Sequence, residues 1–127
     1  MTDPSWPLQQ ALYQALSNAL PCPVYDAVPQ GAAFPYVTLD REVRRNADFL
    51  SSRMDERFFY LNVWSDYPGQ KEVKEIIAAI DAALHRQPLT LATGRVVSCI
   101  VRDTDTSRDA DGTTYMGRVT LQILTQH

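Results

Sequence analysis

The stretch RFFYLNVWSDYPGQKEVKEIIAAIDAAL, residues 57–84, decides the fold, because it joins the clearest strand to the clearest helix. Its first nine residues, 57–65, are rich in aromatic and β-branched side chains, which favour a strand. Further along, apolar residues recur at i, i+3, i+4 and i+7, which predicts an amphipathic helix over residues 70–86. Pro68 and Gly69 mark the turn between them. The sequence therefore predicts a strand followed at once by a helix.

Alternation along strand 57–65 places different side chains on its two faces. The helix-facing residues are expected to be Phe59, Leu61 and Val63. The outward residues are mainly aromatic: Phe58, Tyr60, Asn62 and Trp64. A sheet face in contact with water usually carries Thr, Lys or Glu at such positions. Cross-strand aromatic packing would explain the outward residues without a partner. We favour the alternative, a face that another subunit covers.

A first helix is predicted over residues 5–20, where leucines and alanines recur at helical spacing. After a connector rich in proline and alanine, residues 36–43 alternate as a strand does. Its residues on one face are expected to be Val37, Leu39 and Val43. This strand and strand 57–65 form a long hairpin, whose tip at residues 44–55 is charged.

Two further strands are predicted at residues 95–102 and 115–124. The first is apolar on both faces, whereas the second alternates. Its inward residues are expected to be Val119, Leu121 and Ile123. Residues 103–112 between these strands are acidic and turn-forming. The path from strand 57–65 through the helix to strand 95–102 allows a right-handed crossover, which would make the sheet locally mixed.

The element order helix, two strands, helix, two strands predicts an α+β fold. We expect a mainly antiparallel sheet with both helices packed on one face. The 127 residues suit one domain, 1–127, with a core that needs no disulfide or metal. A content of 45% hydrophobic and 21% charged residues is ordinary for a globular protein.

Several classes of protein are disfavoured by composition. A net charge of −3 and a pI of about 5.2 argue against a dedicated nucleic-acid-binding protein. Cys22 and Cys99 lie far apart and lack the spacing of a zinc site or a disulfide framework. The sequence shows no signal-peptide pattern and no apolar run of membrane-spanning length. We therefore expect a soluble, intracellular protein.

The sequence contains none of the common nucleophile, phosphate-binding or metalloprotease motifs. Its two histidines are His85 and His127, and neither adjoins a Cys or Ser in a recognisable nucleophile motif. We accordingly expect no catalytic residue and no cofactor.

The acidic segment 103–112 is the one candidate metal site. If Gly112 is taken as the sixth residue of an EF-hand-like loop, polar residues occupy the first, third and fifth positions. These are Ser107, Asp109 and Asp111. The twelfth position, which should supply a carboxylate, is Arg118. We therefore favour a solvated hairpin turn over a metal site.

Charged residues of both signs gather around the long hairpin. The arginines are Arg41, Arg44, Arg45, Arg53 and Arg57. The acidic residues among them are Asp40, Glu42, Asp48, Asp55 and Glu56. A solvated, ion-paired hairpin would contribute little to stability. Phe49 and Leu50, which are apolar residues at the polar tip, favour instead an arm that docks on a partner.

The hairpin and the aromatic strand together supply the candidate residues for a subunit or partner interface. They are Arg44, Arg45, Phe49, Leu50, Arg53, Phe58, Tyr60 and Trp64.

Two segments of the chain resemble a known family. VYDAVPQGAAFPYV (24–37) and VWSDYPGQKEVKEI (63–76) are similar to the tail completion family of tailed phages and gene transfer agents. This family includes tail terminator and head-to-tail joining proteins. The resemblance spans about residues 7–125, and DGTTYMGRVTLQI (111–123) also fits it.

The resemblance implies a small α+β subunit that assembles as a hexameric ring in the virion tail. Such a ring would cap the finished tail tube, stop its polymerisation and face the head connector. The implied partners are further copies of the chain, the tail tube protein and the head–tail connector protein, with DNA passing through the lumen. The resemblance implies no enzymatic activity, no cofactor and no membrane, and places assembly in the bacterial host cytoplasm.

Other functions stay open at this point. The chain could be another neck or minor tail component, of phage, prophage or gene transfer agent origin. It could also be a monomeric protein-binding module, or a small enzyme that uses a divalent metal at residues 103–112.

Overall fold

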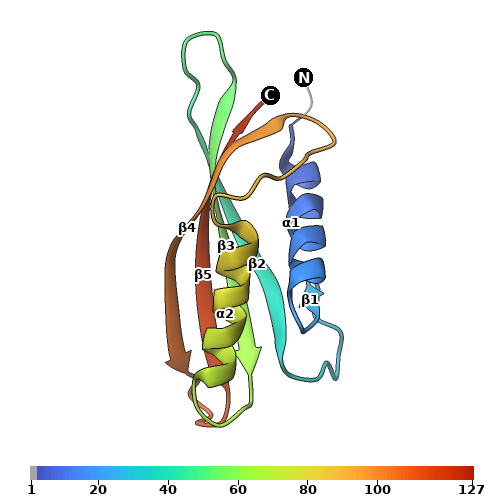
Figure 1. Ribbon diagram of the computed structural model, residues 1–127, viewed down its shortest axis with the longest axis vertical. Helices are drawn as coiled ribbons and strands as arrows, with labels where there is room; N and C mark the ends of the chain where they lie inside the picture. Colours follow the sequence, from blue (N-terminus) through green and yellow to red (C-terminus); the bar gives the residue numbers. More distant parts are fainter. Residues whose placement is uncertain (1–2) are drawn as a thin grey trace.

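The computed structural model describes residues 3–127, which form two helices and a five-stranded sheet (Figure 1). The helices are α1 (Ser5–Ala19) and α2 (Lys71–Leu84). The strands are β1 (Val24–Tyr25), β2 (Tyr36–Asn46), β3 (Met54–Ser65), β4 (Arg95–Arg108) and β5 (Tyr115–Gln126). The predicted α+β fold is confirmed, with the short strand β1 added to the expected order. No helix in the described part of the chain is long and apolar enough to cross a membrane.

The strands lie in the order β1-β2-β3-β5-β4. β1 runs parallel to β2, and the other neighbouring strands run antiparallel. The chain passes from β3 through α2 to β4, and β5 lies between these two strands. Because β3 and β4 both pair antiparallel with β5, this crossover adds no parallel pair. Within residues 3–127 the sheet is mixed through β1, and not through the crossover as expected.

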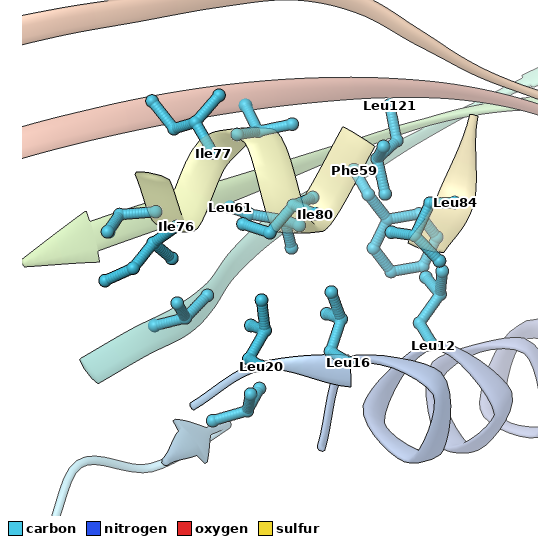
Figure 2. Packing of buried hydrophobic residues seen from close by; sticks show 14 of the residues in the cluster. Leu12, Leu16, Leu20, Phe59, Leu61, Ile76, Ile77, Ile80, Leu84 and Leu121 are labelled. Atoms are coloured by element: carbon cyan, nitrogen blue, oxygen red, sulfur yellow. The ribbon is translucent and has the colours of Figure 1, made fainter. Parts of the chain in front are cut away.

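The core lies between the two helices and one face of the sheet (Figure 2). α1 contributes three fully buried leucines, Leu8, Leu12 and Leu16. The buried residues of α2 follow the predicted stripe: Val73, Ile76, Ile77, Ile80 and Leu84. The inward residues of β3 and β5 are buried as predicted: Phe59, Leu61, Val63, Val119, Leu121 and Ile123. Burying one such side chain contributes roughly 1.5–3 kcal/mol, so this layer holds the helices on the sheet.

Helix α2 approaches β5 closely at Gly117. A Cβ atom at this glycine would lie 2.6 Å from Val73 Cγ1 and 2.8 Å from Ile77 Cδ1. The absence of a side chain at this inward position therefore sets the distance between helix and sheet.

A β-bulge reverses the two faces of β2 along its second half. The register shifts between Leu39 and Arg41, which leaves Asp40 as the extra residue. Val43 consequently lies on the outer face, and Glu42 takes the inward position. The alternation predicted for this strand was wrong beyond the bulge, because one inserted residue exchanges the faces of all that follow.

β4 is longer than predicted and continues to Arg108. Residues 103–108 of the expected acidic loop are therefore strand, and the turn is confined to residues 109–114. Two β-bulges interrupt the pairing of β4 with β5. Val97 lies at the first bulge and is exposed, whereas Cys99 is buried. The bulge places Val96 and Cys99 on the same inward face, and Ile100, opposite Gln122, stays on the outer face.

Candidate functional site

The base of the β2–β3 hairpin is built around Arg57, whose side chain is completely buried. Its guanidinium donates to Asp3 Oδ1 at 2.7 Å and to Glu42 Oε2 at 2.9 Å. It also donates to Thr125 Oγ1 at 3.1 Å and lies 3.4 Å from Asp55 Oδ2. Burial alone would lower the pKa of Arg57, but the hydrogen bonds to Glu42 and Asp3 outweigh this effect and raise it. The alternative of a solvated, ion-paired hairpin therefore does not describe this arginine.

This cluster also fixes the two ends of the described chain at the hairpin base (Figure 1). Asp3, just before α1, accepts a second hydrogen bond from Arg44 at 2.7 Å. Burial would raise the pKa of Asp3, but the hydrogen bond and charge of Arg57 lower it overall. At the other end, the amide of His127 donates to the carbonyl oxygen of Arg53 at 3.0 Å. The direction of the hairpin is thereby set relative to α1 and β5.

Beyond this base, the hairpin projects from the sheet and carries an apolar tip (Figure 1). Phe49 is 67% exposed and Leu50 is 90% exposed. Backbone hydrogen bonds between Phe49 and Ser52, at 2.9 and 3.2 Å, close the turn, and Asp48 pairs with Arg53 at 3.6 Å. Leu50 has a φ of 55°, in the left-handed region that costs a side-chain-bearing residue roughly 1–2 kcal/mol. An ordered turn therefore presents two apolar side chains to solvent.

The outer face of the sheet carries the predicted aromatic residues, which arginines partly cover. The guanidinium of Arg41 lies 5.0 Å from the centre of the Tyr60 ring. Arg45 and Arg102 lie 5.6 and 5.9 Å from the centre of the Phe58 ring. Such cation–π contacts contribute about 0.5–1 kcal/mol each at exposed sites. Packing within the subunit thus explains part of this aromatic row, and the rings still remain partly exposed.

Charges of both signs surround the aromatic row. Trp64 donates its indole N–H to Thr38 Oγ1 at 3.2 Å near one end of the face. β4 brings Asp105 opposite Arg118 of β5, and Asp103 lies nearby. A surface with mixed charge around aromatic rings suits a specific protein contact better than a polyanion, which would require a basic excess.

The turn between β4 and β5 is organised by Asp111. Its carboxylate accepts hydrogen bonds from Thr114 Oγ1 at 2.7 Å and from the amides of Thr114 and Thr113 at 2.8 and 2.9 Å. These bonds, the Thr114 hydroxyl first, lower the pKa of Asp111. Across residues 3–127, no group of three or more His, Cys, Asp or Glu side chains is arranged to hold a metal. The bonds of Asp111 favour the turn interpretation of this segment.

Sequence reasoning missed one surface, a groove beside α1. Trp6 is 60% exposed and Tyr13 is 45% exposed, and with Leu39 of β2 they line a groove of about 390 Å³. Gln9 and Gln10 contribute polar edges. Trp6 and Tyr13 are seven residues apart and so lie on one helix face. The seven-residue spacing of Trp6 and Tyr13 is present in the sequence, but the leucines of the same helix form a more regular pattern and dominated its interpretation.

The structure separates the predicted interface residues into three places. The hairpin tip holds Phe49, Leu50 and Arg53. The outer sheet face holds Arg45, Phe58, Tyr60 and Trp64. Arg44 lies on the opposite face, beside Asp3.

Comparison with known proteins gives a consistent result. Residues 8–126 match the family model described as tail completion protein gp17. A chain in the solved structure "Virion of native gene transfer agent (GTA) particle" is 25% identical, with a TM-score of 0.87 and 100% of both chains covered. A second solved structure is 16% identical, with a TM-score of 0.55 over 97% of this chain and 93% of its own, and is similar in fold alone. No curated protein matches the sequence.

Proposed function

The chain belongs to the family of tail completion protein gp17, and from this premise we propose that it terminates the tail of a phage-type particle. The family match over residues 8–126 is the observation that carries the proposal. The similarity to a chain of a gene transfer agent virion extends over the whole length. The protein is a structural component of a phage or gene transfer agent particle rather than an enzyme.

In the finer proposal, several copies form a ring, a hexamer as the family resemblance implies, on the end of the tail tube. One side of the ring contacts the tube protein, the other contacts the head–tail connector protein, and DNA passes through the lumen. Two features of the subunit support this arrangement. The hairpin tip exposes Phe49 and Leu50, and the outer sheet face carries a row of partly exposed aromatic side chains.

The ring would need contacts between unlike surfaces of neighbouring copies. Head-to-tail contacts of this kind close into rings when the rotation per copy divides a full turn. The candidate interface residues lie on both the projecting hairpin and the sheet, which is compatible with such a contact.

The experiment that tests this function mixes the purified protein with uncapped, growing tail tubes, whose ends are then imaged by electron microscopy. We expect a ring at the end of each tube and an arrest of elongation. Tubes that continue to grow without a cap would contradict the terminator function. Binding to the connector protein but not to tubes would point instead to another neck component.

A further inference from the structure

We propose that the hairpin tip of one copy, formed by Phe49 and Leu50, docks into the α1 groove of a second copy, lined by Trp6, Tyr13 and Leu39. This inference rests on the proposed function, because it names the contact that would build the ring.

The tip carries a leucine where the backbone disfavours one. Leu50 has a φ of 55° and is 90% exposed. Gly, Asn and Asp suit such left-handed turn positions, whereas a leucine bears a steric cost there. Neither Leu50 nor Phe49 belongs to the hydrophobic core described for residues 3–127. A disfavoured backbone state that presents an apolar side chain to water indicates a function outside the monomer.

The groove beside α1 has the complementary character. Trp6, Tyr13 and Leu39 make its lining mainly apolar, and its volume of about 390 Å³ falls within the roughly 300–1,000 Å³ of typical ligand pockets. It therefore has room for two apolar side chains. The hairpin of the same copy points away from α1 (Figure 1), so the occupant must come from another molecule.

The charges around the two surfaces also match. Asp26 is the one charged residue that lines the groove, and it takes part in none of the ion pairs described for residues 3–127. The hairpin brings Arg45, which is likewise outside those ion pairs, whereas Arg53 nearer the tip already pairs with Asp48 of its own hairpin. Opposite charges at the rim of an apolar contact favour correct orientation on encounter.

Tip and groove lie on different parts of the subunit, so the contact is heterologous and repeats from copy to copy. The buried cluster around Arg57 fixes the direction of the hairpin, which makes the angle between successive copies reproducible. A constant angle is what a closed ring requires.

Disulfide cross-linking tests the contact. A Leu50→Cys variant and a differently tagged Tyr13→Cys variant are mixed with growing tail tubes and oxidised. Burial raises the pKa of both native thiols, that of Cys99 to about 11, so Cys22 and Cys99 react slowly. We expect a mixed-disulfide dimer. The matched control pairs Leu50→Cys with Val97→Cys, which is exposed on β4, and should give none.

The same samples test the proposed function separately, because capping of tubes by the unmodified protein is scored alongside. If the wild-type protein caps tubes but the Leu50–Tyr13 dimer is absent, or no more abundant than in the control, the docking inference is wrong and the terminator function stands.

A second variant removes the more exposed of the two apolar tip residues without straining the fold. Leu50→Asn suits the left-handed position, so its urea unfolding midpoint should equal or exceed that of the wild type. Its self-association should weaken by at least about tenfold, since a buried leucine is lost. The matched control is Ser51→Asn, at an exposed neighbouring position, which should associate normally. Unchanged association of Leu50→Asn would overturn the docking.

Discussion

At the hairpin base, one guanidinium pairs with carboxylates from three separate parts of the chain. Asp3 precedes α1, Glu42 belongs to β2 and Asp55 belongs to β3. Burying a charge of this kind is costly, and the cost is offset only while the partners remain in place. Arg57 therefore holds the N-terminal segment and both strands of the hairpin together.

Replacing Arg57 tests this role. Arg57→Met should lower the free energy of unfolding by about 3–5 kcal/mol, because it removes the cation that pairs with the buried Asp55 and the half-buried Glu42. Urea unfolding monitored by circular dichroism measures the change. Arg45→Met, on the outer face, should cost no more than about 1 kcal/mol. Equal losses of unfolding free energy in the two variants would show that the buried ion pairs of Arg57 contribute no more than an exposed cation–π contact.

The lowered pKa of Asp3 predicts how the stability of the fold depends on pH. Burial would raise this pKa, but a hydrogen bond from Arg57 and the charge of its guanidinium hold it below its ordinary value of 3.8. A group with a depressed folded pKa stabilises the fold above its unfolded pKa and loses that contribution as pH falls through the folded value. The difference in stability between wild type and Asp3→Asn should therefore be constant near neutrality and shrink below about pH 4.

Urea unfolding at a series of pH values measures this difference. Because Asp3 is 45% exposed, solvent screening should limit its size to about 1 kcal/mol. Asp26→Asn serves as the control, since Asp26 belongs to none of the ion pairs described for residues 3–127. A gap that widens on acidification would contradict the ion pair.

At the scale of elements, the strands differ in how far the sequence predicts them. β3 alternates strictly and α2 has a clear stripe, so the faces of both were predicted correctly. The second half of β2 was not, because nothing local marks Asp40 as the extra residue of a bulge. β1 has two residues, which are too few to show a period. The end of β4 is polar, as edge strands often are, and therefore resembles a loop.

The candidate surfaces likewise differ in how far the sequence indicates them. Phe49 and Leu50 could be predicted because apolar residues stand out in a polar segment. Tyr60 could be predicted because it alternates with core residues on one strand. The groove could not, since it exists only where Leu39 of β2 is brought beside Trp6 of α1. Contacts between distant segments leave no pattern in a single sequence.

The contact between α2 and β5 predicts the effect of adding one methyl group. Gly117→Ala should lower the free energy of unfolding by about 1–3 kcal/mol, because the new Cβ overlaps Val73 and Ile77. Urea unfolding again measures the loss. Thr120→Ala, on the outer side of the same strand, should change stability by less than about 1 kcal/mol. If the two variants were equally stable, the helix would have room to move outward.

For the whole molecule, the outer sheet face predicts a separation between folding and assembly. Tyr60→Glu should leave urea unfolding nearly unchanged, because Tyr60 faces away from the core. Binding to tube ends should weaken by about tenfold or more if a neighbouring subunit covers this face. Tube capping seen by electron microscopy is the measurement, and Tyr60→Phe, which keeps the ring, is the control. An unfolded Tyr60→Glu variant would place this side chain in the monomer core.

The order of the strands also has a consequence for biosynthesis. β5 lies between β3 and β4, yet it is made after both. While the ribosome is still adding residues 109–114, the edges of β3 and β4 that β5 will occupy are both unpaired. Native pairing of β3 and β4 with their common neighbour must therefore wait until residues 115–126 have emerged from the ribosome. A nascent chain stalled before that point would expose an aromatic strand edge, the kind of surface that chaperones and proteases recognise.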